Sequence, residues 1–175
     1  MKMDRGVVLR PWREDDAEAL AQLANDRSIW LGLRDKFPHP YGIDDARSFI
    51  ALAGTMPGWF AVEVEGRLAG GIGVTPRTDV ERVGAEVGYW IGASFRGQGV
   101  ATSALRLLSA QAFRMNPELR RLFAVPYATN RASGRVLEKA GYRLEGTLRQ
   151  SAIKDGKILD QWMYSLLRDE VPESA

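Results

Sequence analysis

The sequence predicts a single mixed α/β domain, with a largely antiparallel sheet of about seven strands flanked by about four helices. Three observations predict this class. Apolar alternation typical of strands and apolar spacing typical of helices follow one another along the chain. Glycine-containing turns join two of the strand pairs. The 175 residues show no internal repeat or linker and suffice for one continuous apolar core, so we expect residues 1–175 to form one domain.

The first part of the chain predicts a strand and two helices. Residues 7–10 are apolar and stop at Pro11, which ends a strand. Asp15 and Asp16 precede apolar residues at helical spacing, so the first helix starts with acidic side chains. We expect residues 25–41 to be irregular. The second helix is expected to begin at Asp44 or Asp45.

A β-rich stretch follows. Residues 59–64 and 68–74 flank Glu65-Gly66-Arg67, a pattern that predicts a hairpin with a glycine turn. A further strand is expected over residues 86–91. A long amphipathic helix is expected from Thr102 to just before Pro117.

The last part of the chain predicts a strand, a helix and a hairpin. Residues 122–125 form a short buried strand. Asn130 is a suitable cap for the next helix, and Gly141 is suited to a left-handed residue after its last turn. Residues 142–148 and 159–167 then form a terminal hairpin.

Composition excludes several classes of function. The net charge is +2 and the basic residues are scattered, so we expect no direct nucleic-acid partner. Without cysteine and with only His39, the chain lacks disulfides, a cysteine nucleophile and a histidine-based metal site, and we expect no metal. No apolar run approaches the ~20 residues of a membrane span, and residues 1–6 lack a signal-peptide core. We therefore expect a cytoplasmic protein without a membrane partner. The oligomeric state stays open, with a homodimer among the alternatives.

Residues 96–101, Arg-Gly-Gln-Gly-Val-Ala, lie between the apolar run 87–91 and the helix expected from Thr102. Glycines let the main chain approach a phosphate closely, and a helix start adds unpaired N–H donors and partial positive charge. The alternative is an ordinary turn, but a turn does not require so many small residues. No Gly-Lys-Ser/Thr follows, which excludes a nucleotide-triphosphate loop, and no strand–helix alternation repeats, which argues against a dinucleotide fold. The loop therefore predicts a phosphorylated ligand.

The order of elements, with this loop after the fourth strand, resembles the GNAT acetyltransferase family over nearly the whole chain. The family motif of Gln or Arg, two residues, Gly, one residue, and Gly or Ala matches residues 96–101. Segments 9–12, 86–91, 130–133, 139–142 and 160–167 also resemble the family, most closely the branch of ribosomal-protein N-terminal alanine and serine acetyltransferases. The resemblance implies the GNAT fold, in which the sheet splays between its fourth and fifth strands.

The resemblance also implies acetyl-CoA as the acetyl donor, bound where those strands splay. The diphosphate would lie on the amides of the loop, with a further side-chain donor from Arg96 or Gln98. The pantetheine arm would pair with main-chain groups near Trp90 and Ile91, opposite Asn130, whose role as a helix cap is compatible with this one. The implied cofactor-binding residues are Trp90, Ile91, Arg96, Gly97, Gln98, Gly99, Val100, Ala101, Thr102 and Asn130.

Acetyl transfer requires a neutral amine. A peptide α-amine (pKa ~7.7–8.0) is partly free at neutral pH, unlike a lysine side chain (pKa ~10.4), so a weak carboxylate base acting through water suffices. Glu86 resembles the family's glutamate, and its alternative is a surface ion pair. Many members have a tyrosine acid where this chain has Leu137, which leaves Ser133 as the available hydroxyl or, alternatively, as support for the helix start. Without cysteine, direct transfer in a ternary complex is preferred.

Related enzymes contact the acceptor with the segment that corresponds to residues 30–41. Exposed-looking Trp30, Phe37 and Tyr41 are candidates there, although aromatic residues more often pack in a core. His39 is a further candidate, which we favour as a loop residue over a catalytic one. Asp160 either binds an acceptor ammonium or, as we favour, forms a hydrogen bond inside the terminal hairpin.

We expect an N-acetyltransferase for a protein or peptide N-terminal α-amine. The alternatives are acetylation of a small amine (a polyamine or aminoglycoside) and a non-catalytic sensor of acyl-CoA. A polycationic acceptor usually calls for a dense acidic patch, and the carboxylates here are scattered along the sequence. We therefore rank a polyamine or aminoglycoside below an α-amine as the acceptor.

Overall fold

The computed structural model describes residues 6–171. The expectation about a leader segment concerns residues 1–6, of which 1–5 lie outside that range. The chain forms two compact units, one made of the residues up to Gly73 with Tyr89–Ala104, the other of Val74–Gly88 with the residues from Leu105 onward.

One sheet of seven strands has the order β1-β2-β3-β4-β5-β7-β6. The β4–β5 pair is parallel, whereas β1–β2, β2–β3, β5–β7 and β6–β7 are antiparallel. The predicted mixed α/β fold with a largely antiparallel sheet is therefore confirmed. The strands are β1 Val7–Arg10, β2 Trp59–Val64, β3 Arg67–Pro76, β4 Gly84–Ile91, β5 Arg121–Ala124, β6 Arg143–Lys154 and β7 Lys157–Leu167.

The described residues contain five α-helices, where about four were expected. The additional one is α2, a single turn in the segment predicted to be irregular; it is too short to show helical periodicity in the sequence. The helices are α1 Ala17–Ala24, α2 Arg27–Trp30, α3 Ile43–Gly54, α4 Val100–Met115 and α5 Arg131–Lys139.

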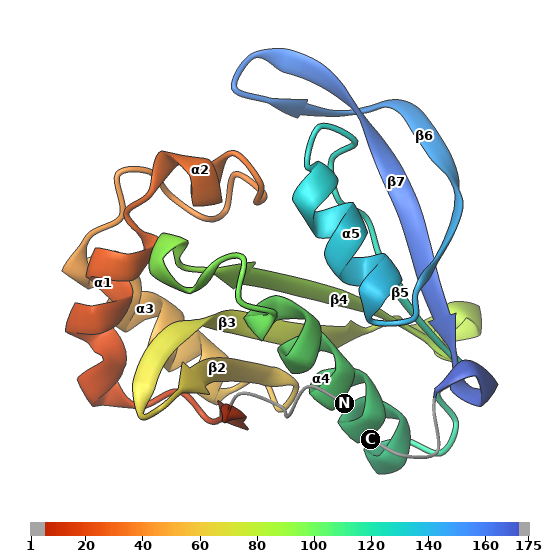
Figure 1. Cartoon of the computed structure of the whole chain (residues 1–175), viewed down its shortest axis with the longest axis horizontal. Coiled ribbons are helices and arrows are strands. Elements are labelled where there is room, and N and C mark those ends of the chain that lie inside the picture. Colours follow the sequence, from red (N-terminus) through yellow and green to blue (C-terminus); the bar gives the residue numbers. More distant parts are fainter. Residues whose placement is uncertain (1–5, 172–175) are drawn as a thin grey trace. The chain divides into compact units, whose positions relative to one another are not determined.

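In the first unit, α1 and α3 lie side by side (Figure 1). Their facing residues form an apolar cluster with the segment between them, and its buried members are Ala17, Leu20, Ala24, Tyr41, Ala46 and Ile50. Arg10 on β1 joins this region to the sheet, because its guanidinium contacts Asp16 at 2.7 Å and Glu63 at 2.5 Å. The predicted hairpin with a glycine turn joins β2 to β3, and Glu65 and Gly66 in this turn both have positive φ.

In the second unit, β6 and β7 form a long hairpin that ends at Asp155 and Gly156 (Figure 1). The helix α5 packs beside β6, and Gly141 follows it with a φ of +99°, as expected for a residue after the last turn. The buried Ser109 and Tyr142 hydroxyls lie 2.9 Å apart and join α4 to the start of β6.

Within residues 6–171, none of the helices combines the length and the apolar character needed to cross a membrane.

Candidate functional site

The loop at residues 96–101 has two glycines in left-handed conformations. The φ angles are +72° at Gly97 and +83° at Gly99, which side-chain-bearing residues rarely adopt. A Cβ atom built at either position would meet no atom within 4 Å. Packing therefore does not require glycine here. The backbone conformation does, and the space beside these main-chain atoms is open.

The helix that follows begins at Val100, two residues before the expected start at Thr102. The Ser103 amide donates to the Gly99 carbonyl at 3.0 Å and closes the first turn. Gly99 is therefore the residue that precedes the helix, and a left-handed glycine is not recognisable as such in the sequence. The N–H groups of Gly99, Val100, Ala101 and Thr102 belong to the set that has no acceptor within the helix. Together with the helix dipole, they suit an anion.

The side chains of the loop donate to the protein itself. The Arg96 guanidinium donates from Nε to the Ile91 carbonyl at 3.1 Å and from Nη1 to the Ser28 hydroxyl at 2.9 Å. The Gln98 amide donates to the Ser94 carbonyl at 2.8 Å. The sequence predicted that Arg96 or Gln98 adds a donor for a phosphate, but each already has an internal acceptor. The donors that the helix geometry leaves without an acceptor are main-chain amides from Gly99 onward.

The end of β4 is held closely by β3. The Gly92 amide donates to the Ala69 carbonyl at 2.9 Å, and a Cβ atom at Gly70 would overlap the Trp90 carbonyl oxygen. The Trp90 ring packs edge-on against Phe37, with ring centres 5.9 Å apart, and Ile91 is buried. Both side chains thus serve the packing of the first unit, and the Ile91 carbonyl also accepts the Arg96 guanidinium.

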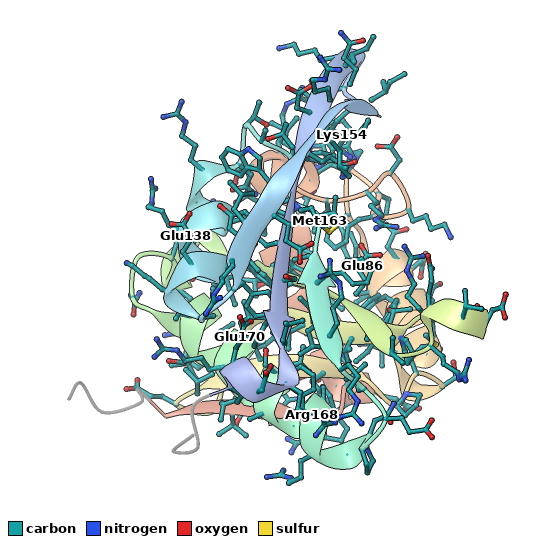
Figure 2. The ribbon with its side chains drawn as sticks, turned by 90° about the vertical axis from the view of Figure 1, so that its right-hand side faces the viewer. Glu86, Glu138, Lys154, Met163, Arg168 and Glu170 are labelled. Carbon is teal, nitrogen blue, oxygen red and sulfur yellow. The ribbon has the colours of Figure 1, made fainter. Side chains whose placement is uncertain are left out.

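Glu86 lies on the part of β4 that pairs with β5. The strand β4 pairs with β5 in parallel at three positions, and at the last of these Glu86 lies opposite Phe123. The strand β4 continues to Ile91 beyond this register. Glu86 is half-buried, and Figure 2 shows it on the opposite side of the β6–β7 ribbon from Glu138 in that view.

The start of α5 is built as the sequence predicts. The Asn130 side-chain oxygen accepts the Ser133 amide at 3.1 Å. Leu137, at the position where the resemblance implies a tyrosine in many members, is fully buried. A tyrosine hydroxyl does reach α5, but it comes from β7: Tyr164 donates to Glu138 at 3.0 Å. Burial raises the pKa of Tyr164, and Glu138 raises it further. Sequence reasoning missed this contact because 26 residues separate the partners.

The candidate acceptor residues differ in exposure. Tyr41 is only 4% exposed and stacks on Phe37, with ring centres 4.7 Å apart. Burial raises the pKa of the Tyr41 hydroxyl, and Asp45 adds to the effect. The expectation of an exposed Tyr41 is therefore wrong; core packing prevails because the aromatic ring fills the α1–α3 cluster. Trp30 faces His39 with ring centres 5.9 Å apart. The buried His39 Nδ1 has no hydrogen-bond partner among the described residues.

Asp160 has the structural role that the sequence favoured. Its carboxylate accepts the Gln150 amide at 2.7 Å across the terminal hairpin. Gln150 has a φ of +49°, so this hydrogen bond holds an unusual backbone conformation at the irregular part of β6.

The candidates fall into two groups. The first unit holds the loop, Trp90, Ile91 and the acceptor candidates Trp30, Phe37, His39 and Tyr41. The second holds Glu86, Asn130, Ser133 and Asp160. Across residues 6–171, His, Asp and Glu side chains form no cluster of three suited to a metal ion.

Comparison with known proteins identifies relatives over most of the chain. Residues 7–143 match the family model described as the acetyltransferase (GNAT) domain. A curated relative is the provisionally named ribosomal N-acetyltransferase YdaF of Bacillus subtilis (strain 168), which is 31% identical over 179 residues, 97% of this chain and 95% of its own length.

Solved structures share the fold. RimJ of Mycobacterium smegmatis, in complex with a CoA disulfide, has a TM-score of 0.82 at 25% identity and covers 96% of this chain and 85% of its own. The microcin C7 self-immunity acetyltransferase MccE, in complex with acetyl-CoA and AMP, has a TM-score of 0.82 at 24% identity and covers 95% of both chains. The second likeness supports the fold alone.

Proposed function

Because the chain belongs to the GNAT acetyltransferase family and is an acetyl-CoA-dependent N-acetyltransferase, we propose that its acceptor is the N-terminal α-amine of a protein or peptide. The provisional name of YdaF, a ribosomal N-acetyltransferase, supports this acceptor class. We further propose that residues 1–175 act as one catalytic domain in the cytoplasm.

The observation that carries the proposed cofactor site is the open main chain at the start of α4. Gly97 and Gly99 have positive φ and no atom near the position of a Cβ, and the first-turn amides lack helical acceptors. Such a surface fits a diphosphate, because several N–H groups converge on it without side chains in the way. When bound, acetyl-CoA supplies an activated thioester.

The remaining roles belong to side chains and are proposals. Glu86 accepts a proton from the acceptor amine, directly or through water. Ser133 donates a hydrogen bond to the departing sulfur. Main-chain groups of Trp90 and Ile91 bind the pantetheine arm, and Asn130 contacts it as well as capping α5. Trp30, Phe37 and His39 contribute to acceptor binding. Transfer is direct, since the sequence contains no cysteine to carry an acetyl group.

The cofactor site is tested by thermal unfolding with and without acetyl-CoA. Wild-type protein should gain several degrees in Tm at saturating ligand, and Gly99→Glu should abolish the gain by placing a negative side chain against the phosphates. Gly66→Glu is the matched control, because Gly66 also has positive φ and no neighbour near a Cβ but lies in the β2–β3 turn. An undiminished gain in Gly99→Glu would refute the site.

The acceptor class is tested by release of free thiol from acetyl-CoA with a panel of amines. Peptides that begin with alanine or serine should react faster than spermidine, aminoglycosides and free amino acids. A preference for spermidine or an aminoglycoside would replace the proposed acceptor, and binding without turnover on any amine would favour the sensor.

A further inference from the structure

The side chain of Arg96 connects three separate parts of the first unit. Its Nε donates to the carbonyl of Ile91 at the end of β4 (3.1 Å), and its Nη1 donates to the Ser28 hydroxyl in α2 (2.9 Å). Its Nη2 lies 3.5 Å from the carboxylate of Asp26. One residue of the glycine loop thus holds both the last residue of β4 and the start of α2.

The α2 end of this connection is itself well organised. Asp26 Oδ1 accepts both the amide and the hydroxyl of Ser28, each at 2.7 Å, which caps the helix. The hydrogen bonds from Ser28 lower the pKa of Asp26, and the nearby charge of Arg96 lowers it further. Asp26 therefore remains ionised and paired near neutral pH.

The helix α2 depends on contacts with the rest of the first unit for its stability. It has only four residues, which is far too short for a stable isolated helix. Ile29 is its buried side chain, and Trp30 follows at its end, facing His39. The contacts of the Arg96 side chain with Asp26 and Ser28 therefore help to determine the position of Trp30.

We infer that Arg96 is a positioning residue that couples binding of the cofactor at the glycine loop to the order of α2. The inference rests on the proposed function, because it takes residues 96–102 as the diphosphate site. A ligand that fixes the loop also fixes the Arg96 backbone, and the guanidinium transmits this constraint to Asp26 and Ser28.

Coupling of this kind is reciprocal. If the loop orders α2, then the α2 contacts must also strengthen binding at the loop by the same factor. Asp26 and Ser28 are not among the proposed cofactor residues, so an effect of their substitution on cofactor affinity would pass through Arg96.

Hydrogen exchange tests whether binding at the loop orders α2. Coenzyme A is the probe, so that no acceptor or turnover is needed. Saturating coenzyme A should slow exchange of the Ser28–Leu31 amides in the wild type and leave it nearly unchanged in Arg96→Lys, whose single ammonium cannot make the three contacts.

Affinity measurements by calorimetry test whether the α2 contacts strengthen binding at the loop. Arg96→Lys and Ser28→Ala should each raise the Kd for coenzyme A by about fivefold, and the double variant by little more than either, because they break one connection. Ser28→Ala keeps the main-chain bond to Asp26, so the cap persists. Asp44→Asn is the control: it removes a carboxylate from the exposed Asp44–Arg47 pair, which does not include Arg96, and should leave Kd unchanged.

The outcomes separate the two proposals. Equal protection of α2 in wild type and Arg96→Lys, or additive effects in the double variant, would overturn the coupling while leaving the cofactor site intact. Failure of coenzyme A to protect residues 97–102 in the wild type would refute the cofactor site itself, and the coupling with it.

Discussion

The side-chain oxygen of Asn130 lies 3.1 Å from the main-chain nitrogen of Ser133 and accepts its hydrogen, which caps the first turn of α5. A cap of this kind is a full structural reason for an asparagine. It also fixes the side chain, so Asn130 presents its amide group in one orientation.

Replacing Asn130 separates the cap from a ligand contact. Asn130→Ala should lower the free energy of unfolding by ~1 kcal/mol, whereas Asn130→Ser keeps a capping oxygen and should stay within a few tenths of wild type. Urea unfolding measures both. If Asn130 also contacts the pantetheine arm, Asn130→Ser should still weaken acetyl-CoA binding, because its side chain is shorter. Normal affinity of Asn130→Ser for acetyl-CoA would show that Asn130 only caps α5 and does not contact the ligand.

Ser133 offers a clean test of a hydroxyl donor. The cap uses the main-chain N–H of Ser133, so Ser133→Ala leaves that hydrogen bond in place. If the hydroxyl assists the departing thiolate, kcat should fall by about tenfold while the Kd for acetyl-CoA and the Tm change little. A normal kcat in steady-state assays would exclude Ser133 from the reaction.

Glu86→Gln should slow transfer most at low pH, where the acceptor amine is protonated and needs a base. The expected loss is about 100-fold in kcat/KM below neutral pH, and it should shrink as the α-amine deprotonates near pH ~8. Acetyl-CoA affinity, measured separately, should remain nearly unchanged. A variant with the same pH–rate profile as wild type would exclude Glu86 as the base.

Gly70 allows β3 to approach β4 closely. A Cβ atom there would overlap the Trp90 carbonyl oxygen and lie 3.0 Å from the Ile91 Cα, and main-chain atoms cannot easily move aside. Gly70→Ala should therefore destabilise the fold by about 2 kcal/mol or more. Gly88→Ala is the control on β4, because a Cβ atom there meets nothing within 4 Å. Chemical denaturation should show little loss in the control; equal losses would contradict the close contact.

Glu145 should make stability depend on pH in the acid range. Hydrogen bonds from Arg121 and Ser165 lower the pKa of Glu145 to about 2. A folded-state pKa below the unfolded value gives stability that is present above the unfolded pKa of ~4.3 and is lost as the pH falls through about 2. The difference in urea stability between wild type and Glu145→Gln should be constant above pH ~5 and shrink below it. A difference that grows on acidification would show that the sign is wrong.

Local signals in the sequence were sufficient for most elements. Positive φ was indicated by the glycines at two boundaries, and the structure has a turn at Gly66 and a helix end before Gly141. A capping side chain was indicated at Asn130, and the structure has that cap. The predicted start of α4 was two residues too late. Gly99 precedes the helix in a left-handed conformation, and the residues beside it in the sequence do not indicate that conformation.

The parts that could not be predicted depend on contacts between distant residues. Whether Tyr41 is exposed is decided by the α1–α3 cluster around it. The engagement of Arg96 by Ser28 spans 68 positions of the chain, so the sequence could show only that a guanidinium was present in the loop. The roles of Glu86 and Ser133 remain predictions, since they depend on bound substrates.

The donors at the start of α4 belong to the peptide backbone, and this has a consequence for how the site responds to its surroundings. Peptide N–H groups do not ionise between acid and alkaline conditions, and of all side-chain exchanges only one to proline removes such a group. A diphosphate held there would keep its hold across a broad pH range, and sequence drift at residues 98, 100 and 101 would matter only where it altered the path of the chain.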